Sequence, residues 1–262
     1  MIDYCSLNQM NQPQRRFEPI TIGRLAPDFI ALSTQGYIRL SDYRGKWVVL
    51  TSHPSAFGAV STTEIISSAQ DYPRLSEQNI EIIGLTTDNI YSILAWVNDI
   101  YQNTGISIPF PIISDTDLSL SETYGMVSPD RMFGSTVRST FLIDPSGKIR
   151  LIFTLPVSTG INREEFYRIL ESILISDTYN LHTPANWKPG DPVVVPNPVS
   201  YEEMVSRAEN SESLGYYCPL WYLCYTNLDM ENAGAIVPPQ VNNNVVSPQD
   251  TKTYSLTYSA QQ

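Results

Sequence analysis

The fold of this chain is decided by the stretch WVVLTSHPSAFGAVSTTE, residues 47–64. The apolar run at 47–50 predicts a buried strand, and the residues from about 62 onward predict a helix. A loop between a buried strand and a helix N-terminus is a favourable place for a nucleophile or an anion, because the first backbone N–H groups have no partner inside the helix. In this stretch, position 61 holds a serine.

Hydrophobic patterning on either side of this stretch predicts strands that alternate with helices. Strands are expected over 37–40, 47–52, 80–85, 111–113, 137–143 and 149–155. Helices are expected over 62–77, 90–103, 118–124 and 163–177. In the helix over 90–103, the apolar residues at helical spacing are Ile90, Leu94, Val97 and Tyr101. This order predicts an α/β domain with a central mixed β-sheet and helices on both faces.

Composition excludes several classes of partner. The 262 residues carry a net charge of −11 with a pI near 4.6, which argues against binding to nucleic acid or to anionic membranes. No apolar run reaches the roughly 18 residues that a membrane span needs, and no signal peptide is visible in the first 16 residues. Three cysteines, Cys5, Cys218 and Cys224, make no closed disulfide framework, so a reducing cytoplasmic location is expected.

The central stretch resembles the peroxiredoxins of the one-cysteine class. That family carries the motif P-x-x-x-T-x-x-C here, usually within S-H-P-x-x-F-T-P-V-C-T-T-E. Pro54 matches the proline of the motif, whereas Gly58 stands in place of its threonine and Ala59 in place of a frequent proline. Ser61 stands where the family has its peroxidatic cysteine. Because several positions depart together, an engineered single replacement is the less favoured explanation.

The resemblance extends over about residues 19–224 and implies a thioredoxin-like fold with an extended C-terminal arm. The motif APDF at 26–29 matches the family's entry signature, and TPANWKPGD at 183–191 matches a segment of its C-terminal arm. The resulting domain prediction has four parts. They are an N-terminal arm at 1–18, a thioredoxin-like domain at 19–178, an arm for dimerisation at 179–225 and a polar tail at 226–262.

A peroxidatic site requires a thiolate held by positive charge, and the resemblance places the family's arginine at Arg138. A serine hydroxyl is a weak nucleophile without an adjacent base, and a pair with His53 is not favoured. The favoured role for Ser61 is a helix cap in a capping box with Glu64. Arg138 is either the remnant of a peroxide site or, as favoured, a strand residue paired with Glu64 or with a backbone carbonyl.

The segment CPLWYLC at 218–224 resembles a C-x-x-W-Y-x-C sequence of some bacterial and archaeal relatives, in which the two thiols are resolving or structural. Cys218 and Cys224 could form a disulfide with each other. The favoured interpretation is that they pack among aromatic residues as small hydrophobic side chains.

These features lead to one main functional prediction and two alternatives. The main prediction is a peroxiredoxin homologue that has lost cysteine-based peroxidase activity and serves as a structural, assembly or binding subunit. The first alternative is a thiol-dependent peroxidase that acts through Cys218 or Cys224, with the thiol delivered to the Arg138 pocket. The second is a sensor that binds a small anion or a peroxide without converting it.

The predicted partners follow from the same resemblance. A homodimer is expected, with a ring of dimers as a further possibility for the assembly. An unidentified protein partner is expected to bind the tail at 226–262, whereas nucleic acid and membrane insertion are not expected. No cofactor and no metal site are predicted.

Overall fold

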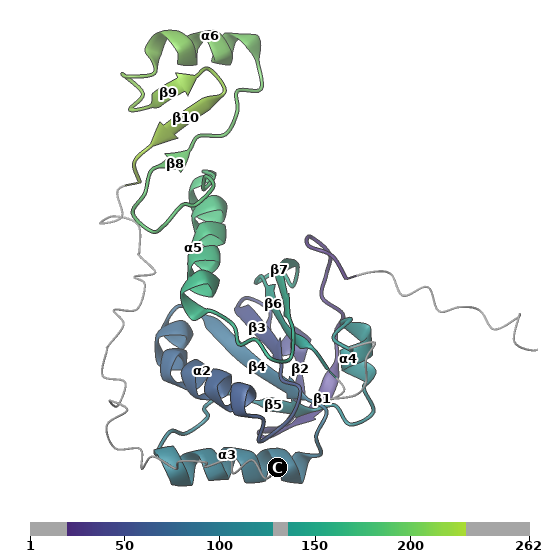
Figure 1. Ribbon diagram of the computed structural model, residues 1–262. Coiled ribbons are helices and arrows are strands. Elements are labelled where there is room, and N and C mark those ends of the chain that lie inside the picture. Colours follow the sequence, from purple (N-terminus) through teal and green to yellow (C-terminus); the bar gives the residue numbers. More distant parts are fainter. Residues whose placement is uncertain (1–19, 128–135, 229–262) are drawn as a thin grey trace, which may run out of the picture. The chain divides into compact units, whose positions relative to one another are not determined.

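A computed structural model describes residues 20–127 and 136–228 of the chain. The chain divides into two compact units, residues 1–162 and 163–262, and each is described by itself (Figure 1). The predicted N-terminal arm at 1–18 and nearly all of the predicted polar tail lie outside the described residues. No helix of the described part of the chain is long and apolar enough to cross a membrane.

The N-terminal unit is built on a mixed sheet of seven strands in the order β2-β1-β5-β4-β3-β6-β7 (Figure 1). Their bounds are β1 Ile30–Ser33, β2 Gly36–Arg39, β3 Trp47–Ser52, β4 Ile80–Thr86, β5 Ile112–Ser114, β6 Arg138–Ile143 and β7 Ile149–Leu155. Strands β3, β4 and β5 are mutually parallel, whereas every other pairing is antiparallel. The mixed sheet predicted from the sequence is therefore present.

The central strand β3 is buried on both faces of the sheet. Val48 and Leu50 point into one core together with Phe141 of β6. Successive side chains of a strand point to opposite faces, so Val49, which is also buried, belongs to the second face. A strand covered on both sides reads as a continuous apolar run, which is why the sequence predicts β3 within its correct bounds.

Helices cover this sheet. Helix α2 (Ala59–Glu77) packs on β4, and α3 (Ile90–Thr104) packs on β5. The short helix α4 (Ser119–Thr123) contributes Leu120 to the edge of the core, and a 3-10 turn, η1 (Leu40–Tyr43), follows β2. Helix α2 begins three residues before its predicted start and continues through Pro73.

The buried face of α3 differs from the apolar stripe that the sequence indicates. The buried residues are Ile93, Trp96 and Ile100, whereas Leu94 and Tyr101 are exposed. Two apolar stripes at helical spacing compete on this helix. The structure buries the stripe with Trp96, whose indole N–H donates to Thr62 Oγ1 of α2 at 3.0 Å.

The C-terminal unit begins with helix α5 (Arg163–Tyr179), whereas the domain prediction places these residues at the end of the 19–178 domain. A small antiparallel sheet in the order β8-β10-β9 follows, with α6 (Tyr201–Asn210) between its strands in sequence. The strands are β8 Val193–Val194, β9 Tyr217–Leu220 and β10 Leu223–Thr226. The four-part domain division remains a prediction.

Candidate functional site

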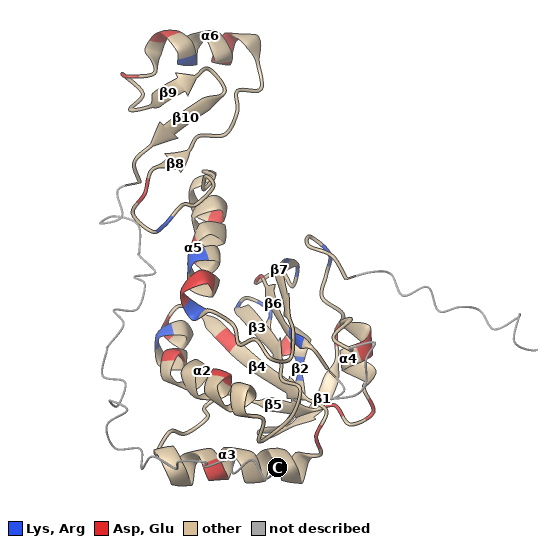
Figure 2. Cartoon of the chain, viewed as in Figure 1, with Lys and Arg blue, Asp and Glu red and all other residues tan. Residues whose placement is uncertain are grey.

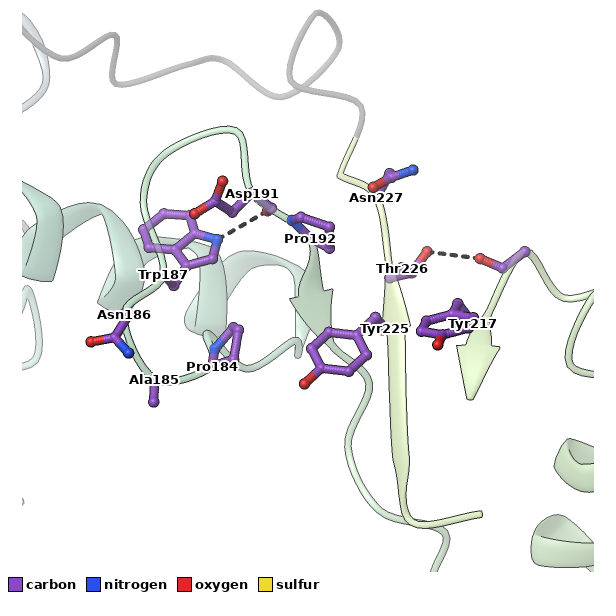
Figure 3. A pocket seen from close by; sticks show the side chains of 11 residues that line it. Pro184, Ala185, Asn186, Trp187, Asp191, Pro192, Tyr217, Tyr225, Thr226 and Asn227 are labelled. Atoms are coloured by element: carbon purple, nitrogen blue, oxygen red, sulfur yellow. Dashed lines mark hydrogen bonds between the residues drawn. The ribbon is translucent and has the colours of Figure 1, made fainter. Parts of the chain in front are cut away.

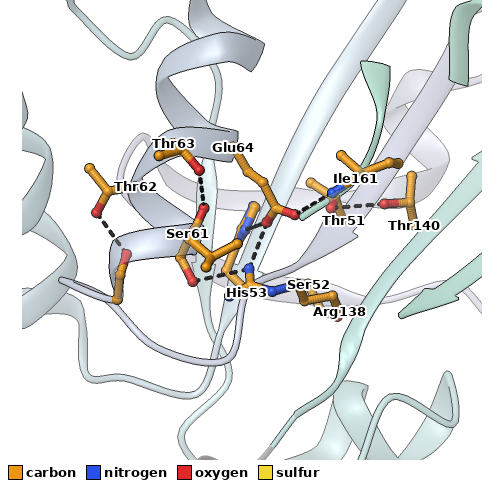
Figure 4. Close-up of polar contacts among 12 residues, drawn as sticks. Thr51, Ser52, His53, Ser61, Thr62, Thr63, Glu64, Arg138, Thr140 and Ile161 are labelled. Atoms are coloured by element: carbon orange, nitrogen blue, oxygen red, sulfur yellow. Dashed lines mark hydrogen bonds and ion pairs between the residues drawn. The ribbon is translucent and has the colours of Figure 1, made fainter. Parts of the chain in front are cut away.

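Ser61 lies in the first turn of α2, at the end of the loop that leaves β3 (Figure 4). The helix N-cap is Gly58, so Ser61 is the third residue of the helix, and its side chain is 1% exposed. Gly58 is next to this hydroxyl, because a Cβ atom built on it would lie 3.1 Å from Ser61 Oγ. Pro54, the residue that follows His53 in sequence, is also buried. Of the predicted residues in this loop, Gly58 therefore lies beside Ser61.

Glu64, one turn further along α2, is the centre of a buried polar network (Figure 4). Its Oε2 accepts a hydrogen bond from Arg138 Nη1 at 2.7 Å and another from His53 Nδ1 at 3.2 Å. Its Oε1 accepts from the backbone N–H of Ile161 at 3.0 Å. The carboxylate therefore joins the end of β3, strand β6 and the segment that follows β7.

The environment keeps Glu64 ionised although it is buried. Burial by itself raises the pKa of Glu64, because a charged carboxylate loses its hydration. The hydrogen bond and charge of His53, the Ile161 N–H and the charge of Arg138 more than offset this effect and lower the pKa below its ordinary value. The network is thus a compensated set of charges, which explains how an ionised carboxylate is accommodated in the interior.

The capping box predicted for Ser61 and Glu64 is wrong. Gly58 is the N-cap, and Glu64 does not reach back to it because its two oxygens already accept from Arg138, His53 and Ile161. The Ser61 hydroxyl instead lies 3.4 Å from Arg138 Nη1, at the long limit of a hydrogen bond.

Arg138 is buried at 6% exposure at the start of β6. Besides its contact with Glu64, its Nε donates to the Val157 carbonyl at 2.8 Å. Arg138 thus makes the contacts of the favoured interpretation, a strand residue paired with Glu64 or with a backbone carbonyl, and its role as the remnant of a peroxide site stays a prediction. Among the described residues, His53 Nε2 has no hydrogen-bond partner, and the His53 ring meets Trp96 edge-on at 6.5 Å between centroids.

The two cysteines of the C-terminal unit form a disulfide, Cys218–Cys224, with an S–S distance of 2.05 Å. The favoured prediction, packing as free thiols, is therefore wrong. The pairing of β9 with β10 sets Tyr217 opposite Tyr225, and this register brings the two cysteines face to face. The sequence did not predict the hairpin, so it could not show that residues 218 and 224 oppose each other.

A groove of about 510 Å³ lies in the same unit (Figure 3). Its lining includes Tyr217 and Tyr225, which flank the cysteines in sequence, and the buried Trp187. The indole N–H of Trp187 donates to the Asp191 carbonyl at 3.0 Å, which fixes one wall of the groove. Over residues 20–127 and 136–228, no cluster of three or more His, Cys, Asp or Glu suits a metal ion.

Two family models match the chain. The AhpC/TSA family model covers residues 22–152, and the model for the C-terminal domain of 1-Cys peroxiredoxin covers residues 176–211. Peroxiredoxin 2 of Caldanaerobacter subterraneus subsp. tengcongensis is 50% identical over 204 residues, which are 78% of this chain and 91% of the relative. This chain belongs to the peroxiredoxin family. The peroxiredoxin of Thermoplasma volcanium is 39% identical over 78% of this chain and 98% of its own length.

Solved peroxiredoxins confirm the thioredoxin-like fold. One, from a study of the thiol resolving mechanism of a yeast mitochondrial 1-Cys peroxiredoxin, has a TM-score of 0.71 and 35% identity. It covers 79% of this chain and 99% of the neighbour. A cysteine-to-serine mutant of the peroxiredoxin 6 of Arenicola marina has a TM-score of 0.70 and 33% identity, over 79% of this chain and 98% of its own.

These relatives contradict the main functional prediction, that the chain has lost peroxidase activity and serves as a structural subunit. Relatives of up to 50% identity are named peroxiredoxins, which supports thiol peroxidase activity. No comparison and no contact among the described residues shows that this activity is lost. The alternative, a thiol-dependent peroxidase, is the better supported prediction.

Proposed function

We propose that this peroxiredoxin is a thiol-dependent peroxidase whose electrons pass through Cys218 and Cys224. The observation that carries the proposal is the disulfide between these two residues in a chain of the peroxiredoxin family. A disulfide is the oxidised product that a dithiol leaves after it has reduced a peroxide. The hairpin that joins β9 to β10 holds both sulfurs in place for this reaction.

We further propose that Ser61 occupies the place of the family's peroxidatic cysteine. The support is its position in the first turn of α2, its contact with Arg138, and the motif residue Pro54 upstream. A hydroxyl has no oxidation states equivalent to those of a thiol, so Ser61 cannot form a sulfenic acid. The reducing thiols must then come from elsewhere, and the described residues contain Cys218 and Cys224.

The chemistry is a two-electron reduction carried out in balanced steps. One thiolate attacks the terminal oxygen of a hydroperoxide, the O–O bond breaks, and the products are a sulfenic acid and an alcohol or water. The second thiol attacks the sulfenic sulfur, forming the S–S bond and releasing water. An external dithiol then reduces this disulfide by two exchange steps and leaves as its own disulfide.

The test is steady-state peroxide consumption with dithiothreitol as reductant. Cys5 lies outside the described residues, so every protein in the comparison carries Cys5→Ser. We expect turnover in this parent and its loss in the Cys218→Ser/Cys224→Ser double variant, which has neither thiol. A parent that consumes no peroxide, or a double variant that keeps the parent's rate, would overturn the proposal.

The assembly and location remain part of this proposal. We propose a homodimer in a reducing cytoplasm, on the basis of family membership and of a cycle that needs a thiol reductant. Sedimentation of the full chain distinguishes a dimer from a monomer. A partner at the predicted tail receives no support, because residues 229–262 lie outside the described part of the chain.

A further inference from the structure

The two sulfurs of the disulfide have different surroundings. Cys224 is 0% exposed, whereas Cys218 is partly exposed on β9. The Cys224 sulfur also lies 3.9 Å from the Leu220 carbonyl oxygen within the hairpin. A peroxide or a reductant coming from solvent therefore reaches one sulfur more readily than the other.

We propose that Cys218 is the sulfur that attacks the peroxide and later receives the reductant, and that Cys224 is the resolving thiol. This assignment rests on the proposed function and deepens it, because it gives each sulfur of the pair one role. It is argued from exposure, from the contacts of Cys224 and from the charge of the surrounding strands.

Cys224 is poorly suited to the first step. The thiolate is the nucleophile, and burial in apolar surroundings disfavours a charged thiolate. The Leu220 carbonyl oxygen, 3.9 Å from the Cys224 sulfur, is an acceptor and provides no N–H or O–H group that could bind a thiolate. The second step needs no access to solvent, because β9 and β10 already hold Cys224 against Cys218.

The hairpin that carries Cys218 is open and contains no charged residue. Tyr217, Leu220 and Trp221 are 71%, 45% and 52% exposed. No Lys, Arg, Asp or Glu occurs between residues 217 and 226, and β9 and β10 accordingly carry no charge colour in Figure 2. The charged residues that give the net charge of −11 lie elsewhere in the sequence. The hairpin itself therefore has no carboxylate that would repel a thiolate reductant.

Each step then has assigned atoms. The Cys218 thiolate takes the terminal peroxide oxygen and becomes the sulfenic acid, while the alkoxide or hydroxide leaves with a proton from solvent. Cys224 sulfur displaces this oxygen as water and closes the disulfide. The reductant's thiolate attacks Cys218, and the electron pair of the S–S bond goes to Cys224, which takes up a proton.

The first test compares Cys224→Ser with Cys218→Ser, both with Cys5→Ser. The two variants lose the same cross-link, so each controls for the stability lost by the other. Reduced protein is treated with hydrogen peroxide and dimedone, and intact mass follows the sulfenic acid adduct. We expect the adduct to form about tenfold faster on Cys218 than on Cys224. Equal rates, or a faster reaction at Cys224, would overturn the assignment.

A second test does not depend on peroxide. The same two variants react with dithiodipyridine, a neutral disulfide that releases an absorbing thione, and Cys218 is expected to react about tenfold faster. Failure of the parent to consume peroxide would refute the proposed function and, with it, the role of Cys218 toward peroxide. Equal exchange rates in a parent that does consume peroxide would refute the assignment alone, so the two failures are distinguishable.

Discussion

Replacing Glu64 by glutamine tests whether the buried network holds the strand–helix loop in place. The glutamine side chain would keep the size and one acceptor oxygen but remove the charge that compensates Arg138, which is 6% exposed. Removing one partner of a buried ion pair costs about 3–5 kcal/mol, and the retained acceptor places this change near the lower end. At about 2–4 °C per kcal/mol, the N-terminal unit should melt about 6–12 °C lower.

The pH dependence of this effect follows from the lowered pKa of Glu64. A carboxyl whose pKa is lower in the folded state contributes stability above its unfolded value, ordinarily 4.5, and this is lost as pH falls through the folded pKa. At low pH the wild-type side chain is protonated and resembles glutamine. The difference in unfolding free energy between wild type and Glu64→Gln should therefore be largest near neutral pH and shrink toward zero in acid.

The assay is thermal unfolding followed by near-ultraviolet circular dichroism at neutral pH and in a descending pH series. Glu77→Gln is the matched control, because Glu77 lies on the same helix and is exposed. This control should change stability by less than about 0.5 kcal/mol. A Glu64→Gln protein that melts within a degree of wild type, or a difference that does not change with pH, would refute the account of the network.

Three further predictions concern the rest of the molecule. Ser61→Cys, made in a variant in which Cys5, Cys218 and Cys224 are all replaced by serine, should form a sulfenic acid that dimedone traps. The parent without Ser61→Cys should form no such adduct. Absence of the adduct in Ser61→Cys would contradict the proposal that position 61 corresponds to the family's peroxidatic cysteine. Trp187→Phe should destabilise the C-terminal unit by about 1–3 kcal/mol, because the buried side chain loses volume and its hydrogen bond to the Asp191 carbonyl. The exposed Trp221→Phe is its control in chemical denaturation, and equal effects would count against the role of the indole N–H. Reduction of the disulfide should lower the unfolding free energy of the same unit by about 2 kcal/mol, and unchanged denaturant midpoints would be the contrary result.

Local patterns in the sequence predict much of the sheet and some of the site. The run at 47–52 is correctly predicted as β3, and the helix expected over 163–177 is observed as Arg163–Tyr179. Pairing of Arg138 with Glu64 is also confirmed, since a buried arginine needs a nearby acceptor.

Other features depend on contacts between distant parts of the chain. The capping role of Ser61 failed because Glu64 is engaged by Arg138 and by Ile161, which are 74 and 97 residues away in sequence. One local signal was missed. Ser200 caps α6 by accepting from the Glu203 N–H, and Glu203 reaches back to the Val199 N–H, so this capping pattern could have predicted the helix.

The disulfide illustrates the same limit. Two cysteines six residues apart in sequence can pack, pair or ligate, and local sequence does not choose between these. The choice is made by the register of β9 on β10, in which Tyr217 lies opposite Tyr225. A hairpin predicted at 217–226 would have been the necessary first step.

The central claim is that the Cys218–Cys224 pair carries the peroxidase chemistry, and a single-turnover reaction tests it most directly. Fully reduced protein with Cys5→Ser is mixed with one equivalent of hydrogen peroxide, and intact mass and residual peroxide are measured together. The account predicts that peroxide disappears while the protein loses two hydrogen atoms, with peptide mapping placing the new bond between Cys218 and Cys224. Peroxide that persists beside an unchanged dithiol would contradict the account.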